Sequence, residues 1–278
     1  MQKPHSALII RQVPFFTDFI RMTNDACQKG WHERNAGNLS YGICSEEITD
    51  IRDHLHPPRT WTPIGVSVPD LGGAYFLVTG SGKCLRNVNL YPEENMAIVR
   101  IDQTGQNYSI VWGLEKGGSP TSELPTHLLT HAVSRQTQNG RRVVYHAHPS
   151  SIIALSFVLP LTDYAFTREL WGMATECPVV FPDGVGVVPW MVPGSIDIAR
   201  ATESLMRKYS VVVWAHHGVM CAGTDFDDAL GLMETVEKSA EISIKVRSMG
   251  GVRQSVTPDQ LRVMARAAGV TLSDTFLN

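Results

Sequence analysis

The sequence predicts an α/β fold in which one sheet carries helices on both faces. Short runs rich in β-branched residues alternate along the chain with longer segments of helical period. Two of these runs, 97–101 and 108–112, flank a turn at 102–107 and indicate an antiparallel hairpin. A sheet that contains such a hairpin is not purely parallel, so we expect a mixed sheet.

Length and composition narrow the class of protein. The 278 residues are 43% hydrophobic, which is enough for a large core in one domain or two. The net charge is −3 and no block is strongly basic, so neither a nucleic acid nor a membrane surface is an expected partner. No apolar run is long enough to span a bilayer, and no secretion signal is evident. Five dispersed cysteines without a Cys-x-x-Cys pair indicate free thiols, so we expect a cytoplasmic protein.

The first third of the chain predicts a helix, a turn, an insertion and a strand. Pro14 suits the first turn of a helix that Gly30 ends. Residues 31–40 are rich in Asn and Gly, which form turns and sometimes anion-binding nests of backbone N–H groups; an ordinary turn is favoured here. Residues 46–70 are polar and proline-rich, and they predict an irregular insertion before a strand at 74–79.

A glycine-rich loop, Gly80-Ser81-Gly82-Lys83, directly follows that strand. A nucleotide-binding P-loop requires Gly at position 77 and Ser or Thr at position 84, where this chain has Leu77 and Cys84. The nucleotide interpretation therefore fails. A short Gly/Ser loop after a strand is still suited to hold a phosphate group.

A helix is predicted from an N-cap at Ser122 to about Arg135. Glu123 near its start has a purely structural explanation, because the helix dipole favours a carboxylate there. The same helix terminus also favours a phosphate, with hydroxyls supplied by Thr121 and Ser122.

The later elements follow the same alternating pattern. Helices are expected at 151–159, at 196–209, from Thr224 or Asp225 to about Met249, and from Thr257 to Gly269; strands are expected at 141–148, 179–181, 186–188 and 211–214, and 166–173 is ambiguous.

Two histidines close the strand that begins at Arg141. Side chains alternate along a strand, so His146 and His148 project from the same face and both reach one metal ion. A lone His-x-His pair is more often structural than metal-binding. His217 at the end of another apolar strand and Glu123 upstream strengthen the metal interpretation, because three imidazoles and a carboxylate suit Zn²⁺.

The combined residue set favours carbanion chemistry on a sugar phosphate. A metal polarises a carbonyl and stabilises an enediolate, while a carboxylate such as Glu123 or Glu176 moves the proton. A Schiff-base lysine is the competing way to stabilise the carbanion. Lys83 is the only lysine near the predicted site, and it lies in a glycine loop where it would be exposed to water.

At these residues the chain resembles the class II aldolase/adducin superfamily, and most closely the bacterial L-rhamnulose-1-phosphate aldolases within it. The motifs run in family order over nearly the whole chain. They are Gly30-Trp31-His32-Glu33-Arg34-Asn35-Ala36-Gly37-Asn38-Leu39, Thr79-Gly80-Ser81-Gly82-Lys83, Pro120-Thr121-Ser122-Glu123-Leu124-Pro125, His146-Ala147-His148, Glu176-Cys177, Val179-Val180-Phe181-Pro182-Asp183-Gly184-Val185-Gly186, Pro189-Trp190-Met191-Val192-Pro193-Gly194 and His217-Gly218.

The resemblance implies a three-layer α/β/α sandwich with a mixed, mostly antiparallel sheet. It also implies that residues 1–278 form a single catalytic domain and that the chain assembles as a fourfold-symmetric homotetramer. The implied reaction is reversible cleavage of L-rhamnulose 1-phosphate, a small sugar phosphate, into dihydroxyacetone phosphate and L-lactaldehyde.

The resemblance also assigns roles to residues. His146, His148 and His217 are the implied ligands of one Zn²⁺ per subunit. Glu123 is the implied fourth ligand, which moves aside and transfers a proton, and Glu176 is a second acid/base. The implied phosphate-binding residues are Asn35, Gly37, Asn38, Ser81, Gly82, Thr121 and Ser122.

The chain departs from the family pattern at His32, at Ala36 and at Pro149-Ser150. Spacing alone does not choose between His216 and His217, but the family pattern of His before Gly favours His217. Two alternatives remain open. One is a sibling enzyme, either an aldolase for another ketose 1-phosphate or a metal-dependent pentose-phosphate epimerase. The other is an adducin-like binding module without a metal, against which the intact histidines and Glu123 argue.

Overall fold

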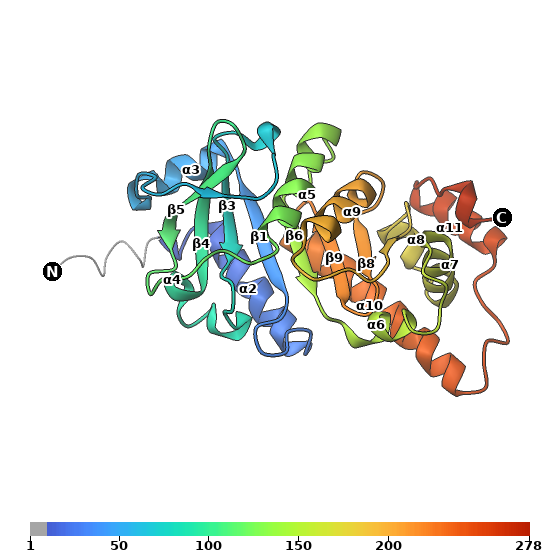
Figure 1. Cartoon of the computed structure of the whole chain (residues 1–278). Coiled ribbons are helices and arrows are strands. Elements are labelled where there is room, and N and C mark those ends of the chain that lie inside the picture. Colours follow the sequence, from blue (N-terminus) through green and yellow to red (C-terminus); the bar gives the residue numbers. More distant parts are fainter. Residues whose placement is uncertain (1–9) are drawn as a thin grey trace.

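The computed structural model describes residues 10–278 and shows nine strands in one sheet (Figure 1). The order across the sheet is β2-β5-β4-β3-β1-β6-β9-β8-β7. All neighbouring strands pair antiparallel except β7 and β8, which are parallel. The strands are β1 (Asn38–Ile43), β2 (Thr62–Pro63), β3 (Tyr75–Thr79), β4 (Met96–Ile101), β5 (Asn107–Gly113), β6 (Val143–Ala147), β7 (Gly186–Val188), β8 (Val211–Trp214) and β9 (Gly218–Gly223).

Helices cover both faces of the sheet (Figure 1). The helices are α2 (Pro14–Gln28), α3 (Ser45–Ile51), α4 (Pro92–Asn95), α5 (Leu124–Thr137), α6 (Ser150–Leu155), α7 (Asp163–Met173), α8 (Cys177–Val180), α9 (Ile196–Met206), α10 (Phe226–Ser248) and α11 (Pro258–Ala268). Helices α5 and α9 pack together on one face, and α10 packs with α2, α6 and α7 on the other. The mixed, mostly antiparallel α/β/α sandwich expected from the sequence is confirmed.

Strand alternation separates the core into two layers. Val143 and Tyr145 of β6 belong to the hydrophobic cluster under α2 and α10, whereas Val144 belongs to the cluster under α9. His146 therefore projects to the α5/α9 face, where its ring packs against Trp214 at a tilt of 37°, with centroids 4.4 Å apart.

Most helices and strands predicted from the sequence are present at about the predicted residues. The hairpin of β4 and β5 and the helices α2, α9, α10 and α11 are present. Asp225 caps α10 by accepting a hydrogen bond from the Asp228 N–H at 2.8 Å. The ambiguous segment is helix α7, capped by the Thr162 hydroxyl. Helix α6 is shorter than expected and ends at Leu155.

Other expectations were wrong. The insertion at 46–70 is not wholly irregular, because Glu47 accepts a hydrogen bond from the Cys44 N–H at 2.8 Å and closes the start of α3. The segment around Val179 is the short helix α8 rather than a strand, because Pro178 fits a first helical turn. The N-cap of α5 is Glu123 rather than Ser122. Strands β1 and β9 were not predicted.

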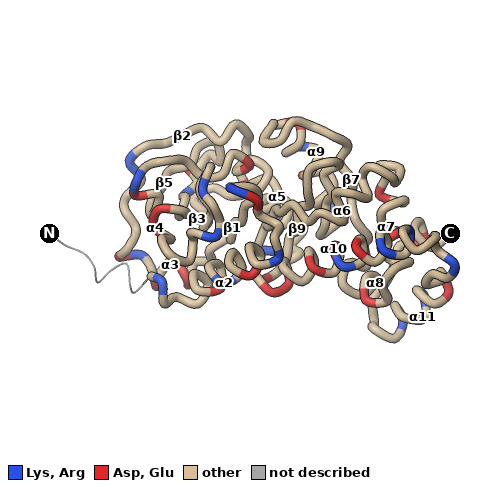
Figure 2. The backbone as a smooth tube through the Cα atoms, turned by 90° about the horizontal axis from the view of Figure 1, so that it is seen from below, with Lys and Arg blue, Asp and Glu red and all other residues tan. Residues whose placement is uncertain are grey.

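Charge is mixed along the chain. Figure 2 shows basic and acidic residues interspersed over the elements at both ends of the sheet. Among residues 10–278, no helix is long and apolar enough to cross a membrane.

Candidate metal centre

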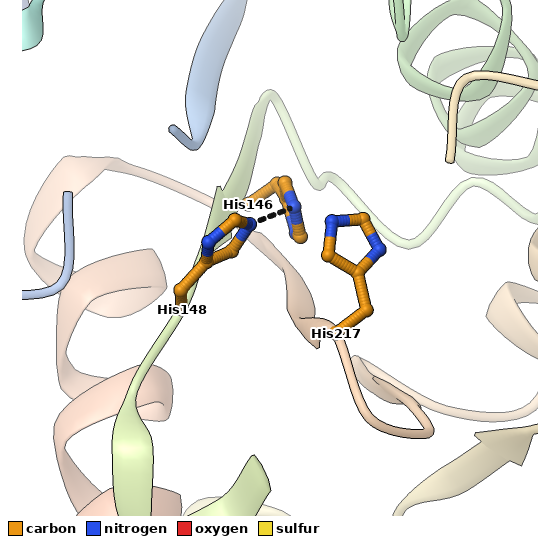
Figure 3. Close-up of side chains that lie close together, drawn as sticks. All are labelled: His146, His148 and His217. Atoms are coloured by element: carbon orange, nitrogen blue, oxygen red, sulfur yellow. Dashed lines mark hydrogen bonds between the residues drawn. The ribbon is translucent and has the colours of Figure 1, made fainter. Parts of the chain in front are cut away.

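Three histidines converge at the end of β6. His146 lies in that strand, His148 follows it, and His217 lies in the turn between β8 and β9. One ring nitrogen of each lies within 4.8 Å of the others. Figure 3 shows the three rings grouped, with a nitrogen of each turned toward the group.

The hydrogen bonds of two rings fix their tautomers. Nδ1 of His146 donates to the backbone carbonyl of Val219 at 3.0 Å, and Nδ1 of His148 donates to the Glu33 carboxylate at 2.7 Å. Both Nε2 atoms then carry lone pairs, yet they lie 3.2 Å apart, at the dashed contact in Figure 3. Two facing lone pairs repel unless a cation lies between them. The donor set therefore fits a metal ion.

The electrostatics agree with neutral, metal-binding imidazoles. Burial lowers the pKa of His146 well below its usual value and that of His217 to about 4. A neutral imidazole is the form that binds a metal. Nδ1 of His217 is buried without a hydrogen-bond partner among the described residues.

A tight turn brings His217 rather than His216 into the group. His216 adopts the left-handed conformation with φ of 62°, and its Nδ1 lies 3.0 Å from the Ser156 hydroxyl, outside the group. Gly218 then passes so close to β6 that a Cβ would lie 2.4 Å from the carbonyl oxygen of Ala147. Only glycine permits this approach.

Glu123 lies beside the three rings. Its carboxylate is buried, its Oε2 accepts a hydrogen bond from Asn38 Nδ2 at 2.8 Å, and the same oxygen lies 3.7 Å from His146 Nε2. Desolvation raises the pKa of Glu123. A cation at the histidines would oppose that shift, because it favours the ionised carboxylate.

The histidines and Glu123 line a cavity of about 160 Å³. Every residue expected at the phosphate lines the same cavity: Asn35, Gly37, Asn38, Ser81, Gly82, Thr121 and Ser122. In the described part of the chain, no hydrogen bond engages the hydroxyls of Ser81 and Ser122 or the amide of Asn35. The Asn38 amide, in contrast, already donates to Glu123. The cavity thus offers free neutral donors next to a possible cation site.

Glu176 is not brought to this cavity. It is the exposed residue before α8 and does not line the cavity of its own chain. Its catalytic role stays a prediction.

Sequence reasoning missed two residues that support the site. Glu33 orients His148 through the hydrogen bond described above. His32 bridges the Ala36 carbonyl at 2.9 Å and the Tyr145 hydroxyl at 2.8 Å, and so fastens the 31–37 loop to β6. Burial lowers the pKa of His32 to about 4. Both residues lie in the first motif, but only the fold shows which strand that motif meets.

The fold and the site together define an α/β/α protein with a three-histidine cluster, suited to a metal ion, beside a polar cavity. The family described as Class II Aldolase and Adducin N-terminal domain matches residues 17–244. The chain belongs to this family, whose aldolases are metal-dependent.

Named relatives match nearly the whole chain. A protein of Mannheimia succiniciproducens named rhamnulose-1-phosphate aldolase is 46% identical over 264 residues, covering 95% of this chain and 97% of that protein. A protein of Pectobacterium atrosepticum with the same name is 45% identical over 258 residues, covering 92% and 94%.

Solved structures share the fold. A sugar-phosphate aldolase from Thermotoga maritima superposes with a TM-score of 0.73 at 26% identity, covering 89% of this chain and 98% of that chain. An L-fuculose-1-phosphate aldolase from Thermus thermophilus gives 0.57 at 21% identity, covering 85% and 95%. The latter similarity shows the fold alone.

Proposed function

We propose that this chain is a metal-dependent aldolase that cleaves L-rhamnulose 1-phosphate reversibly into dihydroxyacetone phosphate and L-lactaldehyde. The observation that carries the proposal is the cavity in which three histidines, a buried carboxylate and unpaired hydroxyls meet. Relatives named rhamnulose-1-phosphate aldolase match nearly the whole chain at 45–46% identity, which favours the same substrate.

His146, His148 and His217 would hold one Zn²⁺ per chain, with Glu123 as the fourth ligand when no substrate is present. Three imidazoles and a carboxylate are a usual zinc set, and a ligand that leaves provides the open position of a catalytic site. When bound, the ion supplies Lewis acidity that polarises the substrate carbonyl and favours negative charge on its oxygens.

The free donors of the cavity would anchor the phosphate. The hydroxyls of Ser81 and Ser122 and the amide of Asn35 lie on three different loops, so they approach an anion from several sides. They carry no competing hydrogen bond within residues 10–278. Thr121, Gly37 and Gly82 complete the wall of this part of the cavity.

Glu123 would move a proton on the half of the substrate that becomes dihydroxyacetone phosphate. In the cleavage direction a base removes the proton of the C4 hydroxyl, the C3–C4 bond breaks to give the aldehyde, and the remaining enediolate takes a proton at C3. Once away from the metal position, the Glu123 carboxylate would take up a proton from water and deliver it to C3, and in the reverse direction it would remove the C3 proton.

The half of the substrate that becomes L-lactaldehyde would lie in a second cleft. This cleft of about 540 Å³ shares His148 and His217 with the cavity and is lined in part by Ile153, Ala154 and Phe157. L-Lactaldehyde ends in a methyl group, which these apolar side chains suit.

Glu176 of a neighbouring chain would take up the proton of the substrate's C4 hydroxyl. Because it is exposed and does not line the cavity of its own chain, it serves this role only if a homotetramer places it at another copy's site. Exposed apolar residues support such a contact. Trp190 and Val192 are 63% and 59% exposed, in the loop whose Gly194 lies against Ser122.

We further propose that residues 1–278 act as one catalytic domain, because a single sheet carries the site residues. A cytoplasmic location is part of the proposal, since all five cysteines are free.

The test is to supply L-rhamnulose 1-phosphate and L-fuculose 1-phosphate side by side and to measure the release of dihydroxyacetone phosphate. We expect faster cleavage of the rhamnulose ester. Preference for the fuculose ester would point to a sibling aldolase. Cleavage of neither, with metal bound, would favour an epimerase or a binding module.

A further inference from the structure

A line of hydrogen-bonded side chains runs from Glu123 into the core between β1 and α5. Asn38 Nδ2 contacts Glu123 Oε2 at 2.8 Å, and Asn38 Oδ1 contacts His127 Nε2 at 2.5 Å. The Ser40 hydroxyl then lies 2.7 Å from His127 Nδ1 and 2.9 Å from His131 Nε2. All five residues are buried. Asn38 and Glu123 also line the cavity, and of the five residues only Glu123 has a part in the proposed reaction.

The line forms because the two-residue repeat of a strand faces the four-residue spacing of a helix. Asn38 and Ser40 are two apart on β1 and share a face. His127 and His131 are four apart on α5 and share a face, one and two turns beyond Glu123. The residues of α5 therefore face those of β1 in alternation, so that each side chain in the line can hydrogen-bond to the next.

Every hydrogen bond in the line points toward Glu123. An ionised carboxylate only accepts, so the Asn38 amide turns its N–H to Glu123 and its oxygen to His127. His127 must then carry its hydrogen on Nε2, which leaves Nδ1 to accept from the Ser40 hydroxyl. The Ser40 oxygen in turn accepts from Nε2–H of His131. Burial lowers the pKa of both histidines to about 3, which agrees with two neutral rings.

The line orients groups and does not conduct protons, because an amide does not pass a proton from its oxygen to its nitrogen readily. The amide torsion of an asparagine is broad and roughly twofold. A turned Asn38 would aim its oxygen at the Glu123 carboxylate. The N–H of His127 opposes that turn, because it needs the Asn38 oxygen as its acceptor.

We propose that His127 is a positioning residue, which through Asn38 holds the Glu123 carboxylate in its place beside His146, and that Ser40 and His131 fix the His127 ring. This inference deepens the proposed function and rests on it for the reaction. Loss of the His127 N–H would let Asn38 turn and Glu123 leave its position. Proton transfer then becomes slower and Glu123 a poorer metal ligand, while the phosphate donors on the other loops are untouched.

The experiment compares three variants. His127→Phe keeps a planar ring and removes the N–H, and His127→Gln restores an N–H donor at similar reach. Thr130→Val is the matched control, because Thr130 is buried on the same helix and its hydroxyl makes one hydrogen bond within residues 10–278, to the Thr126 carbonyl at 2.9 Å. Turnover and KM are measured on the ketose phosphate. Zinc affinity of the metal-stripped protein is measured by competition with a chelator.

We expect His127→Phe to lower turnover by about 10–100-fold, the range for losing a residue that supports a metal ligand through hydrogen bonds. KM should change little, and zinc affinity should fall. His127→Gln should recover most of both losses, and Thr130→Val should behave as the unchanged protein. The proposal is overturned if His127→Phe matches Thr130→Val, or if His127→Gln is as impaired as His127→Phe.

If His127→Phe does not fold, Ser40→Ala decides: it should lower turnover with KM unchanged, and wild-type turnover would overturn the proposal. If the unchanged protein cleaves neither ketose phosphate, the proposed function fails. The zinc affinities then still decide whether His127 positions Glu123.

Discussion

Asn38 lies directly opposite His146 in the antiparallel pairing of β1 with β6. Both side chains point to the α5 face, where the Asn38 amide meets the Glu123 carboxylate and His146 meets the other two histidines. One strand register thus brings Asn38, and with it the Glu123 carboxylate, beside the three histidines. A slip of one residue would turn Asn38 to the opposite face, so the pairing itself holds the site together.

The first prediction concerns the metal. Purified protein should contain about one zinc per chain, because three imidazoles and a carboxylate complete a tetrahedral set. His217→Asn should lower zinc affinity by more than about 100-fold, because loss of a residue that only hydrogen-bonds to a metal ligand already costs about 10–100-fold. His216→Asn is the control, since Asn tolerates the left-handed backbone at that position. Elemental analysis without any divalent metal, or full activity after exhaustive chelation, would refute the assignment.

The second prediction concerns the phosphate. Ser81→Ala should weaken binding of dihydroxyacetone phosphate by about 1.5–3 kcal/mol, the range for a hydrogen bond to a charged group, and should leave zinc in place. Ser119→Ala is a suitable control, because Ser119 is exposed on the neighbouring loop and does not line the cavity. Titration calorimetry that finds equal affinities for the two variants would place the phosphate elsewhere.

The third prediction concerns acid stability of the metal-free protein. Burial lowers the pKa of His127 and of His131 from 6.5 to about 3, so between these values the unfolded chain binds protons that the folded chain does not. Stability therefore falls as pH drops from about 6.5 toward 3, by about 2 kcal/mol per ring between pH 7 and pH 5.

Urea unfolding at the two pH values measures this loss. His131→Gln removes one titrating ring and should lose about 2 kcal/mol less than the unchanged protein. A stability that does not depend on pH over this interval would show that the rings are already protonated or become exposed.

The sequence allowed the histidine set and most helices to be predicted, because each rests on a local pattern. The pair at 146 and 148 needs only strand alternation, and α10 needs only its cap and period. Strand β1 was missed although Leu39, Tyr41 and Ile43 alternate into the core, because the preceding Asn and Gly residues dominated the interpretation. Without β1, nothing in the sequence aligns Asn38 with His146.

Contacts between residues far apart in the sequence could not be predicted from local patterns either. The contacts of Glu33 with His148 and of His127 with Asn38 join residues that are 115 and 89 positions apart. Periodicity locates a residue on its own element, but strand pairing and helix docking decide what it meets. Glu176 is the opposite case: its motif suggested a role, and the fold of one chain does not bring it to the cavity.

The fourth prediction concerns Glu176 and assembly. Light scattering should report a tetramer, and Glu176→Gln and His146→Ala should each be nearly inactive alone. Co-expressed as mixed oligomers, they should recover about a quarter of normal activity, because head-to-tail pairing unites an intact cavity with an intact Glu176 at that fraction of sites. A monomer at micromolar concentration, or mixed oligomers without activity, would contradict a shared site.

The last prediction concerns Glu123, where a structural and a catalytic explanation differ most. As a simple N-terminal carboxylate it is worth at most about 1 kcal/mol of stability. As a metal ligand and proton carrier it is required for turnover. Glu123→Gln keeps the shape of the side chain and its contact with Asn38, and it removes the base.

The direct test of the aldolase assignment is therefore Glu123→Gln, with metal content, thermal midpoint and turnover measured on the same preparation. We expect an unchanged fold, zinc retained at least in part by the three imidazoles, and turnover lower by about 10²–10⁴, the range for lost general acid–base catalysis. Near-normal turnover with zinc bound would contradict the account and reduce Glu123 to a helix cap.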